Sequence, residues 1–169
     1  MTSPPFARGP ALVIVSGGQT GIDRAALRFA EAAGLPYAGW CPRGGWAEDC
    51  PQPPGVRARW PALRETETED PAERTRRNVE TADGLLVLWP PGVRSPGTAL
   101  ALAHARALGR PVAEVHLHAP DAAAKIARAL ACGGRLNIAG PRGSEWPPGE
   151  RVAFALLTAA WGGAAAAGG

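Results

Sequence analysis

Short apolar runs alternate with longer amphipathic segments along the chain. The runs predict five β-strands, at Leu12–Val15, Tyr37–Trp40, Leu85–Trp89, Val112–Leu117 and Leu136–Ala139. The segments that follow them predict five helices, near Ile22–Ala33, Pro71–Thr81, Thr98–Leu108, Asp121–Ala131 and Glu150–Trp161. Because the strands are apolar without strict alternation, they are typical of a parallel sheet that helices cover on both faces. Helix 98–108 is apolar nearly all round, so we expect it to be the most buried.

Three stretches of the chain do not follow this alternation of strands and helices. We expect residues 1–10 to form a disordered N-terminal arm and residues 162–169, which read GGAAAAGG, to form a disordered tail. A single domain at 11–161 is expected between them. The segment from Cys41 to Pro71 is rich in Pro, Gly and charge and shows no periodicity. It follows the carboxyl end of a predicted strand, where ligands bind in open α/β sheets, so we expect it to be functional or disordered.

Three glycine-rich turns each follow a predicted strand. They read SGGQTG at residues 16–21, PPGVRSPGT at 90–98 and AGPRGS at 139–144. Glycine lets the backbone approach an anion, and a following helix points free N–H groups and the positive end of its dipole at that anion. Parallel strands place such turns along one edge of the sheet, so the three turns can enclose one phosphate group. Ordinary loop chemistry is the alternative for the set.

The turns supply a defined set of candidate ligand-binding residues. These are Ser16, Gly17, Gly18, Gln19, Thr20, Gly21 and Asp23 from the first turn, Arg94, Gly97 and Thr98 from the second, and Gly140 and Arg142 from the third. The two arginines would neutralise the charge of the ligand. Thr20 and Asp23 also resemble a capping box, so a role in starting the helix stays open for both.

Two common nucleotide motifs do not fit the first turn. Its pattern is GGxxG rather than GxGxxG, and no acidic residue ends the second strand to hold a ribose, which argues against a nicotinamide enzyme. The Walker pattern fails as well, since no Lys-Ser or Lys-Thr pair follows the glycines.

The composition of the chain indicates which class of protein it belongs to and which kind of ligand it suits. The chain has 169 residues, of which 46% are hydrophobic and 20% are charged, as expected for one globular domain. Eighteen Lys and Arg against fifteen Asp and Glu give a net charge of +3, and the basic residues are scattered. A net charge of this size is compatible with a small anionic ligand and does not indicate nucleic-acid binding.

The cysteine content and the hydropathy of the chain indicate the cellular compartment in which we expect the protein. The three cysteines form no CxxC pair, and neither a disulfide framework nor a zinc knuckle follows from an odd number. We therefore expect a reducing, cytoplasmic environment. No apolar run approaches the ~18 residues of a membrane span, so we expect no membrane association.

Five blocks of the chain resemble a known family. SGGQTGIDRAAL, GWCPRGGWAEDC, ERTRRNVETADGLLVL, SPGTALALA and LNIAGPRGSE are similar, in that order, to blocks of the putative molybdenum carrier protein family. That family resembles a branch of a larger Rossmann-like nucleotide-binding superfamily. The superfamily includes the lysine-decarboxylase-like phosphoribohydrolases, which cut the N-glycosidic bond of nucleoside monophosphates.

The resemblance implies a fold and a strand order. The fold is α/β, a Rossmann-like three-layer αβα sandwich around an open, mainly parallel five-stranded sheet. The chain is circularly permuted relative to the phosphoribohydrolases, whose first strand and loop correspond to residues 136–144 here. The last strand then inserts between the first and third, which gives the order 2-1-5-3-4. The plainer order 2-1-3-4-5 is the alternative.

The resemblance supports phosphate binding by this chain but argues against the phosphoribohydrolase reaction. The phosphoribohydrolases carry a PGGxGTxxE turn and an upstream helical arginine. Arg74 falls at the place of that arginine, and Gly97 and Thr98 match the GT that holds phosphate. Leu100 and Ala101 stand where acidic residues are expected, and neither can stabilise an oxocarbenium ion or activate water. The missing glutamate argues against the phosphoribohydrolase activity.

Other side chains could replace the missing carboxylate or hold a metal. Glu48 and Asp49 lie where the carrier family has an acidic pair, and they are either functional or two solvated loop charges. His116 and His118 share one face at a strand end, but no third ligand has a characteristic spacing, so we predict no metal site. Thr66 or Asp70 is expected to cap the helix that begins at Pro71.

These observations lead to competing functional hypotheses. In the first, the protein binds a small phosphorylated, nucleotide-like ligand, and the resemblance implies molybdenum cofactor and a carrier or storage role. In the second, it is a nucleoside-monophosphate N-glycosidase in which Glu48 or Asp49 acts as the carboxylate and Arg74 orients the substrate. In the third, it is a nucleotide sensor or scaffold.

Three tryptophans in predicted loops could contact a ligand or another subunit under any of these hypotheses. Trp46, Trp60 and Trp146 are candidates for exposed rings that stack on a base or on another subunit. Partly from the family, we expect a homo-oligomer.

Overall fold

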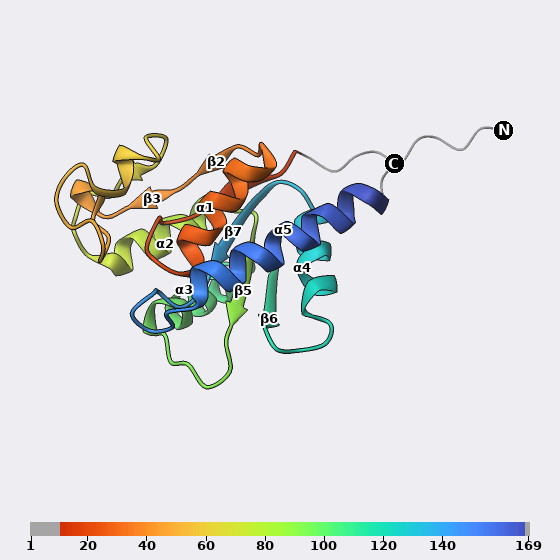
Figure 1. Cartoon of the computed structure of the whole chain (residues 1–169). Helices are drawn as coiled ribbons and strands as arrows, with labels where there is room; N and C mark the ends of the chain where they lie inside the picture. The colour runs from red at the N-terminus through yellow and green to blue at the C-terminus, as the bar shows by residue number, and fades with distance from the viewer. Residues whose placement is uncertain (1–10, 168–169) are drawn as a thin grey trace.

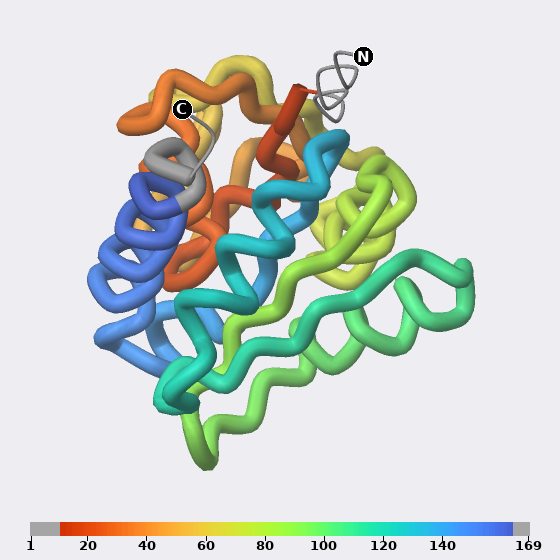
Figure 2. The backbone as a smooth tube through the Cα atoms, turned by 90° about the vertical axis from the view of Figure 1, so that its right-hand side faces the viewer, coloured from red at the N-terminus to blue at the C-terminus, as the bar shows by residue number. Residues whose placement is uncertain are grey.

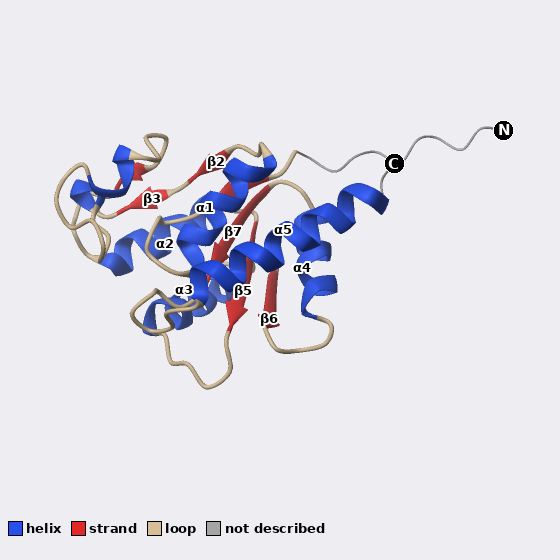
Figure 3. Ribbon diagram, in the orientation of Figure 1, coloured by secondary structure: helices blue, strands red, loops and turns tan. Residues whose placement is uncertain are grey.

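A parallel sheet of five strands lies at the centre of the molecule (Figures 1 and 3). The computed structural model describes residues 11–167, so the arm expected at 1–10 and Gly168 and Gly169 lie outside the described residues. The strands are β1 (Val13–Val15), β2 (Tyr37–Ala38), β5 (Gly84–Trp89), β6 (Val112–His116) and β7 (Arg135–Ala139). Their order is β2-β1-β7-β5-β6. In terms of the five predicted strands this is 2-1-5-3-4, which is confirmed, and the alternative order 2-1-3-4-5 is wrong.

The last strand in the chain occupies the middle of the sheet. β7 pairs in parallel with β1 on one side and with β5 on the other. Its residues Leu136 and Ile138 are buried in the core on one face, while Asn137 points to the opposite face, since side chains alternate along a strand. This insertion brings the carboxyl ends of β1, β7 and β5, and the three glycine-rich turns that follow them, next to one another.

Helices cover both faces of the sheet (Figure 2). The core on one face joins the sheet to α1 (Ile22–Ala33), α4 (Ala122–Ala131) and α5 (Gly149–Ala167). The core on the other face joins it to α2 (Pro71–Thr81) and α3 (Pro96–Ala107). β5 serves both cores, because Leu86 and Leu88 point to the first and Leu85 and Val87 to the second. The predicted three-layer Rossmann-like fold is confirmed.

The helix boundaries follow local signals. Pro71 begins α2, and Asp70 caps it by accepting a hydrogen bond from the Ala72 N–H at 2.9 Å, as one of the two proposed caps should. Ser95 caps α3 in the same way, with Pro96 at the first helical position. Thr66, the other proposed cap, is buried and donates to the Thr68 carbonyl instead.

Two helices differ from expectation. α3 is not the most buried helix: it has four buried residues, and Leu108 just after it is 46% exposed, whereas α1 has seven. The reason is that α1 packs against the sheet, against α5 and, through Leu27, against the segment that follows Cys41, whereas α3 packs against the sheet and α2. α5 does not end at Trp161 but continues to Ala167, because the alanines after Gly162 and Gly163 are strong helix formers. The tail expected at 162–169 is therefore helical as far as the structure describes it.

The second predicted strand, Tyr37–Trp40, is broken at Gly39. This glycine has φ +140°, and a Cβ there would overlap the carbonyl oxygen of Ser16. The chain turns at that point, so that β3 (Trp40–Cys41) leaves the central sheet and pairs in parallel with β4 (Arg64–Glu65). A pattern of hydrophobic residues cannot reveal this break, because both halves are apolar.

The segment between Cys41 and Pro71 is folded rather than structureless (Figure 3). It contains two short 3-10 helices, Arg43–Gly45 and Gly55–Ala58, and β4. Cys41, Val56, Trp60 and Leu63 pack with Leu27 of α1 into a small separate core. Trp60 is only 2% exposed, and the guanidinium groups of Arg24 and Arg59 lie over its ring, so the expectation that this ring is exposed is wrong. Trp46 and Trp146 are half-buried rather than exposed.

None of the helices within residues 11–167 combines the length and the hydropathy that a membrane span requires.

Candidate functional site

A cleft lies where the three glycine-rich turns meet. It opens at the carboxyl ends of β1, β5 and β7 and beside the first turns of α1 and α3, with α2 as its remaining wall. About 50 Å³ of it is accessible to the centres of water molecules. Because one water needs roughly 10–15 Å³ by this measure, the cleft has room for a few waters or one phosphate-sized group.

Most of the predicted ligand-binding residues line this cleft. They are Gly17, Gln19, Thr20, Asp23, Arg74, Gly97, Thr98, Gly140 and Arg142. They come from all three turns and from α2, which are far apart in the sequence. The convergence follows from the strand order, since β7 stands between β1 and β5.

An ion pair is buried at the base of the cleft. Nη1 of Arg74 lies 2.7 Å from Oδ2 of Asp23, and the two side chains are 12% and 11% exposed. Burial raises the pKa of the Asp23 carboxyl, and the positive charge of Arg74 opposes this rise. The pair is possible only because residue 17 is glycine: a Cβ there would overlap the guanidinium group and the Cδ of Arg74.

The remaining predicted residues of the first turn have structural roles. The Ser16 hydroxyl donates to the Asp23 carbonyl at 2.8 Å and accepts from the Gly18 N–H at 3.2 Å. Gly18 and Gly21 both have positive φ, and Gly21 packs against the backbone of the third turn. The predicted capping box is not formed, because Gly21 is the N-cap of α1 and Thr20 and Asp23 bond elsewhere.

The second turn contributes hydroxyl groups and free backbone. Ser95 and Thr98 are both buried, and their hydroxyl oxygens lie 2.7 Å apart. Gly97 lies in the first turn of α3, where N–H groups have no partner within the helix. Arg94 does not line the cleft, since its side chain is exposed at the outer part of the turn.

The third turn approaches the sheet closely at Gly140. A Cβ at this position would meet Ile22 and the carbonyl oxygen of Leu88, so a side chain would push the turn away from β5 and α1. Beyond it, Arg142 and Glu145 reach the cleft. Oε1 of Glu145 accepts hydrogen bonds from the Arg142 N–H and the Ser95 hydroxyl, both at 3.0 Å. The second and third turns are thereby joined.

Comparison with known proteins now identifies this arrangement. The model of the circularly permutated YpsA SLOG family matches residues 14–161. The chain belongs to this family. Its name agrees with the sheet, in which the last strand of the chain stands in the middle.

One solved structure is similar to this SLOG-family chain over nearly its whole length. It is the crystal structure of a putative molybdenum carrier protein from Syntrophus aciditrophicus SB, with 34% identity and a TM-score of 0.76. The match covers 88% of this chain and 94% of the other. None of the curated proteins matches this chain.

The two carboxylates proposed for an enzymatic role lie outside the cleft of this SLOG-family protein. Glu48 is bonded to the Thr20 hydroxyl and to the Ser144 N–H and hydroxyl, the latter two at 2.9 and 2.7 Å. Burial acts to raise the pKa of Glu48, but these hydrogen bonds outweigh it and hold the pKa below its usual range. Glu48 thus ties the 42–70 segment to the first and third turns.

Asp49 pairs with Arg24. Its two oxygens accept from the two terminal nitrogens of the guanidinium group at 2.8 and 2.9 Å. These bonds lower the pKa of Asp49 to about 2, against a smaller opposing effect of burial. Neither Glu48 nor Asp49 lines the cleft, and both carboxylates are bonded to other parts of the protein.

Sequence reasoning missed several cleft residues, of which Asn137 and Glu145 matter most. Asn137 is 4% exposed, lines the cleft, and makes no side-chain hydrogen bond to another described residue. The signal was present in the block LNIAG, where one amide stands alone in a buried apolar strand. Nε of Arg74 is likewise buried without a partner among residues 11–167.

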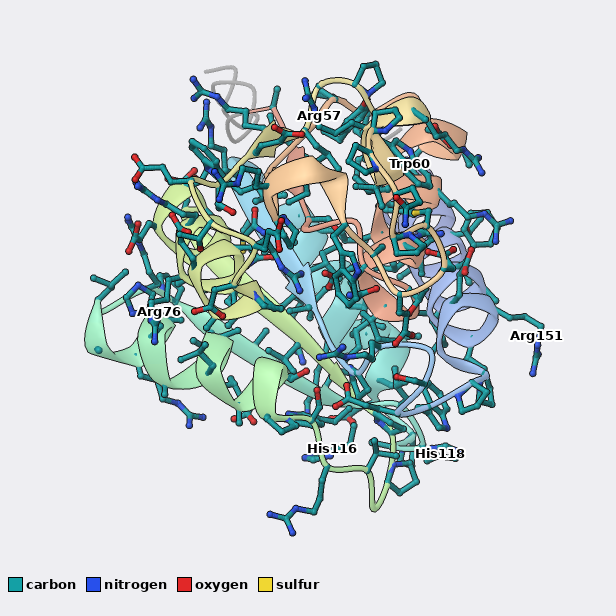
Figure 4. The ribbon with its side chains drawn as sticks, turned by 90° about the vertical axis from the view of Figure 1, so that its left-hand side faces the viewer. Arg57, Trp60, Arg76, His116, His118 and Arg151 are labelled. Atoms are coloured by element: carbon teal, nitrogen blue, oxygen red, sulfur yellow. The ribbon has the colours of Figure 1, made fainter. Side chains whose placement is uncertain are left out.

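The SLOG cleft offers donors for an anion rather than ligands for a metal. Within the described part of the chain, no three His, Cys, Asp or Glu side chains are grouped so that they could hold a metal ion. His116 and His118 are exposed and lie towards one end of the molecule, with Trp60 towards the other (Figure 4). Burial raises the pKa of the Cys41 thiol to about 11, so this cysteine is not a nucleophile at neutral pH.

Proposed function

We propose that the protein binds a small phosphorylated, nucleotide-like ligand whose phosphate enters the cleft. The observation that carries the proposal is the convergence of three glycine-rich turns on one cleft with unused polar groups. Nε of Arg74 is buried without a partner among the described residues, and Asn137, which is 4% exposed, lines the cleft with an amide that makes no hydrogen bond to them. Buried polar groups are costly unless they are hydrogen-bonded, so these two favour a ligand that bonds to them.

The size and charge of the cleft favour a phosphate group over a whole nucleotide. The interior has room for one phosphate-sized group, so the organic part of the ligand would lie at the mouth. Arg74 and Arg142 supply positive charge, and α3 directs its N-terminal N–H groups at the cleft. Two carboxylates, Asp23 and Glu145, line the same space. They can accept hydrogen bonds from hydroxyl or amino groups of the ligand.

Molybdenum cofactor is the ligand that the solved relative suggests, because that protein is named a putative molybdenum carrier protein. The cofactor is a pterin that carries a phosphate and holds the metal itself. The residues present fit its phosphate end, since Arg74, Arg142, Thr98 and the backbone of Gly97 line the cleft. A carrier or storage role follows from binding without chemistry.

Two experiments test this proposal. Native mass spectrometry of the purified protein, followed by release under denaturing conditions, should reveal a bound nucleotide or pterin phosphate. Calorimetric titration with AMP and with adenosine isolates the contribution of the phosphate. We expect AMP to bind more tightly than 1 mM, which is about 4 kcal/mol, and adenosine at least tenfold more weakly. Equal affinities, or no binding of AMP and no released ligand, would refute a phosphate site.

A second candidate function is hydrolysis of an N-glycosidic bond, favoured by one observation. Asp23 is a carboxylate inside the cleft with a raised pKa, which is the property of a general acid. It replaces Glu48 and Asp49 as the residue to test. If the protein is such an enzyme, it releases the free base from nucleoside monophosphates, and Asp23→Asn abolishes that release under conditions where circular dichroism shows that the variant is still folded. Absence of release by the wild-type protein removes this candidate.

A further inference from the structure

The hydroxyl groups at the start of α3 are already bonded to a carboxylate of the protein itself. The Ser95 hydroxyl donates to Oε1 of Glu145 at 3.0 Å, and Oγ1 of Thr98 lies 2.7 Å from Oγ of Ser95. A hydroxyl has one proton to donate, so Thr98 must donate to Ser95 while Ser95 donates to Glu145. The Ser95 proton is therefore donated to the carboxylate and the Thr98 proton to Ser95, so that neither hydroxyl proton is free for another acceptor.

Glu145 is held in this position from the other side as well. The same oxygen, Oε1, accepts from the Arg142 N–H at 3.0 Å, and Nε of Arg142 lies 3.8 Å away. Its side chain is only 20% exposed. A negative charge thus stands beside the N-terminus of a twelve-residue helix, where the helix dipole and the free N–H groups favour an anion.

The carboxylate uses only part of what the cleft offers. Asn137, which is 4% exposed, and Arg74 line the same cleft, and neither the Asn137 amide nor Nε of Arg74 makes a hydrogen bond to another described residue. Glu145 binds the hydroxyls of α3 but leaves these two groups without a bond. A tetrahedral phosphate has more acceptor oxygens than a carboxylate and could serve both sets.

We propose that Glu145 is an internal anion that occupies the phosphate position at the N-terminus of α3, and that a ligand phosphate binds by displacing it. This inference rests on the proposed function and names the residue that determines specificity at that site. Inorganic phosphate makes contacts only inside the cleft, and these contacts alone must displace Glu145. A phosphate attached to an organic group can draw on further contacts at the mouth of the cleft, so Glu145 selects such ligands against free phosphate.

The test compares inorganic phosphate binding by the wild type and by Glu145→Gln, in a buffer free of other phosphates. The glutamine keeps an oxygen that accepts from the Arg142 N–H, so the turn is retained while the charge is removed. We expect the dissociation constant of inorganic phosphate, from an NMR titration of backbone amides, to fall about tenfold, or about 1.4 kcal/mol. Glu145→Ala should shift it in the same direction.

A matched control is Glu150→Gln. Glu150 lies in the first turn of α5, pairs with Arg28 at 2.9 Å and does not line the cleft. This variant has the same change in net charge, so its phosphate affinity should stay within twofold of the wild type. An equal gain in both variants would show a general charge effect and overturn the role of Glu145.

The outcomes separate this inference from the proposed function. If the wild type binds AMP but Glu145→Gln binds inorganic phosphate no better than the wild type, the competing role of Glu145 is wrong and the proposed function stands. Weaker phosphate binding by a folded Glu145→Gln variant would show that the carboxylate contacts the ligand, which also overturns it. If no form of the protein binds AMP or inorganic phosphate, the proposed function itself fails.

Discussion

Arg74 and Asp23 form an ion pair 2.7 Å long across the base of the cleft, although 51 residues separate them in the sequence. The pair joins α2 to the first turn of α1, and Nε of the same guanidinium group is buried without a partner among the described residues. A buried charge is tolerated when it is paired, and removal of one partner is costly. Arg74 thus makes a structural bond and keeps one buried N–H group that no described residue accepts.

Removal of one member of this pair should destabilise the fold. Asp23→Asn leaves the Arg74 guanidinium buried without a counter-charge, and we expect the free energy of unfolding to fall by about 3 kcal/mol. The double variant Asp23→Asn/Arg74→Met has no unpaired charge and should recover at least half of the loss. Urea unfolding of the three proteins measures this. A double variant no more stable than the single one would contradict the account.

Two glycines of the cleft should respond differently to substitution by alanine. Gly17→Ala places a Cβ into the space of the Arg74 side chain, which must move, and we expect a loss of about 1–3 kcal/mol in unfolding free energy. Gly97→Ala places its Cβ where no atom lies within 4 Å, inside a helix, and should be neutral or stabilise by up to about 1 kcal/mol. Thermal unfolding of both variants provides the comparison. Similar losses would mean that Gly17 is not required by Arg74.

Asn137 offers a test that separates function from stability. Asn137→Leu replaces a buried amide that bonds to no other described residue, so stability should stay within about 1 kcal/mol or rise. Binding of AMP should weaken at least tenfold, because the cleft loses a donor and an acceptor.

The matched control for Asn137→Leu is Asn78→Leu. The Asn78 side chain bonds to both the N–H and the carbonyl of Trp40, at 2.8 and 2.9 Å. Its loss should cost about 2–3 kcal/mol in unfolding free energy, since two backbone groups are left without partners. If Asn137→Leu behaves like Asn78→Leu in urea unfolding, Asn137 is structural and not a ligand contact.

Asp49 gives stability a predictable dependence on acid. The pKa of this carboxyl is about 2 in the folded protein, against about 3.9 in an unfolded chain. The unfolded state therefore binds more protons between these values, so the stabilisation is complete above about pH 4 and is lost as the pH falls towards 2. Since the Asp49 side chain is 48% exposed, the effect should be below about 1 kcal/mol.

The lowered pKa of Glu48 acts in the same direction. Urea unfolding at several pH values should show a shallower dependence for Asp49→Asn than for the wild type. Identical slopes for the two proteins would indicate that the Arg24 pair contributes nothing to the folded state.

The central part of the fold could be predicted because its signals are local. The boundaries of α1 and α2 follow from apolar spacing and from Pro71, and the convergence of the turns follows from parallel strands. The strand order did not follow from the hydrophobic pattern, which permits 2-1-3-4-5 equally well. It came from the resemblance, because a circular permutation leaves no local trace in a single sequence.

The errors concern contacts between distant segments. Glu48 bonds to Ser144, which lies 96 residues further along the chain, and the local sequence around neither residue predicts this contact. Trp60 lies in a Pro-rich and Gly-rich stretch that is typical of an exposed loop, but the core it shares with Leu27 depends on how that stretch folds back on α1. Glu145 was overlooked for a similar reason, since its partner Ser95 precedes it by 50 residues.

The most direct test of the central claim is an NMR titration of the isotopically labelled wild-type protein with AMP. The account predicts that the shifted backbone amides cluster at residues 17–20, 97–99 and 140–145, the three turns that line the cleft, and that adenosine leaves them unchanged. Shifts confined to another surface, or no shifts at millimolar AMP, would contradict the claim that the cleft binds a phosphate group.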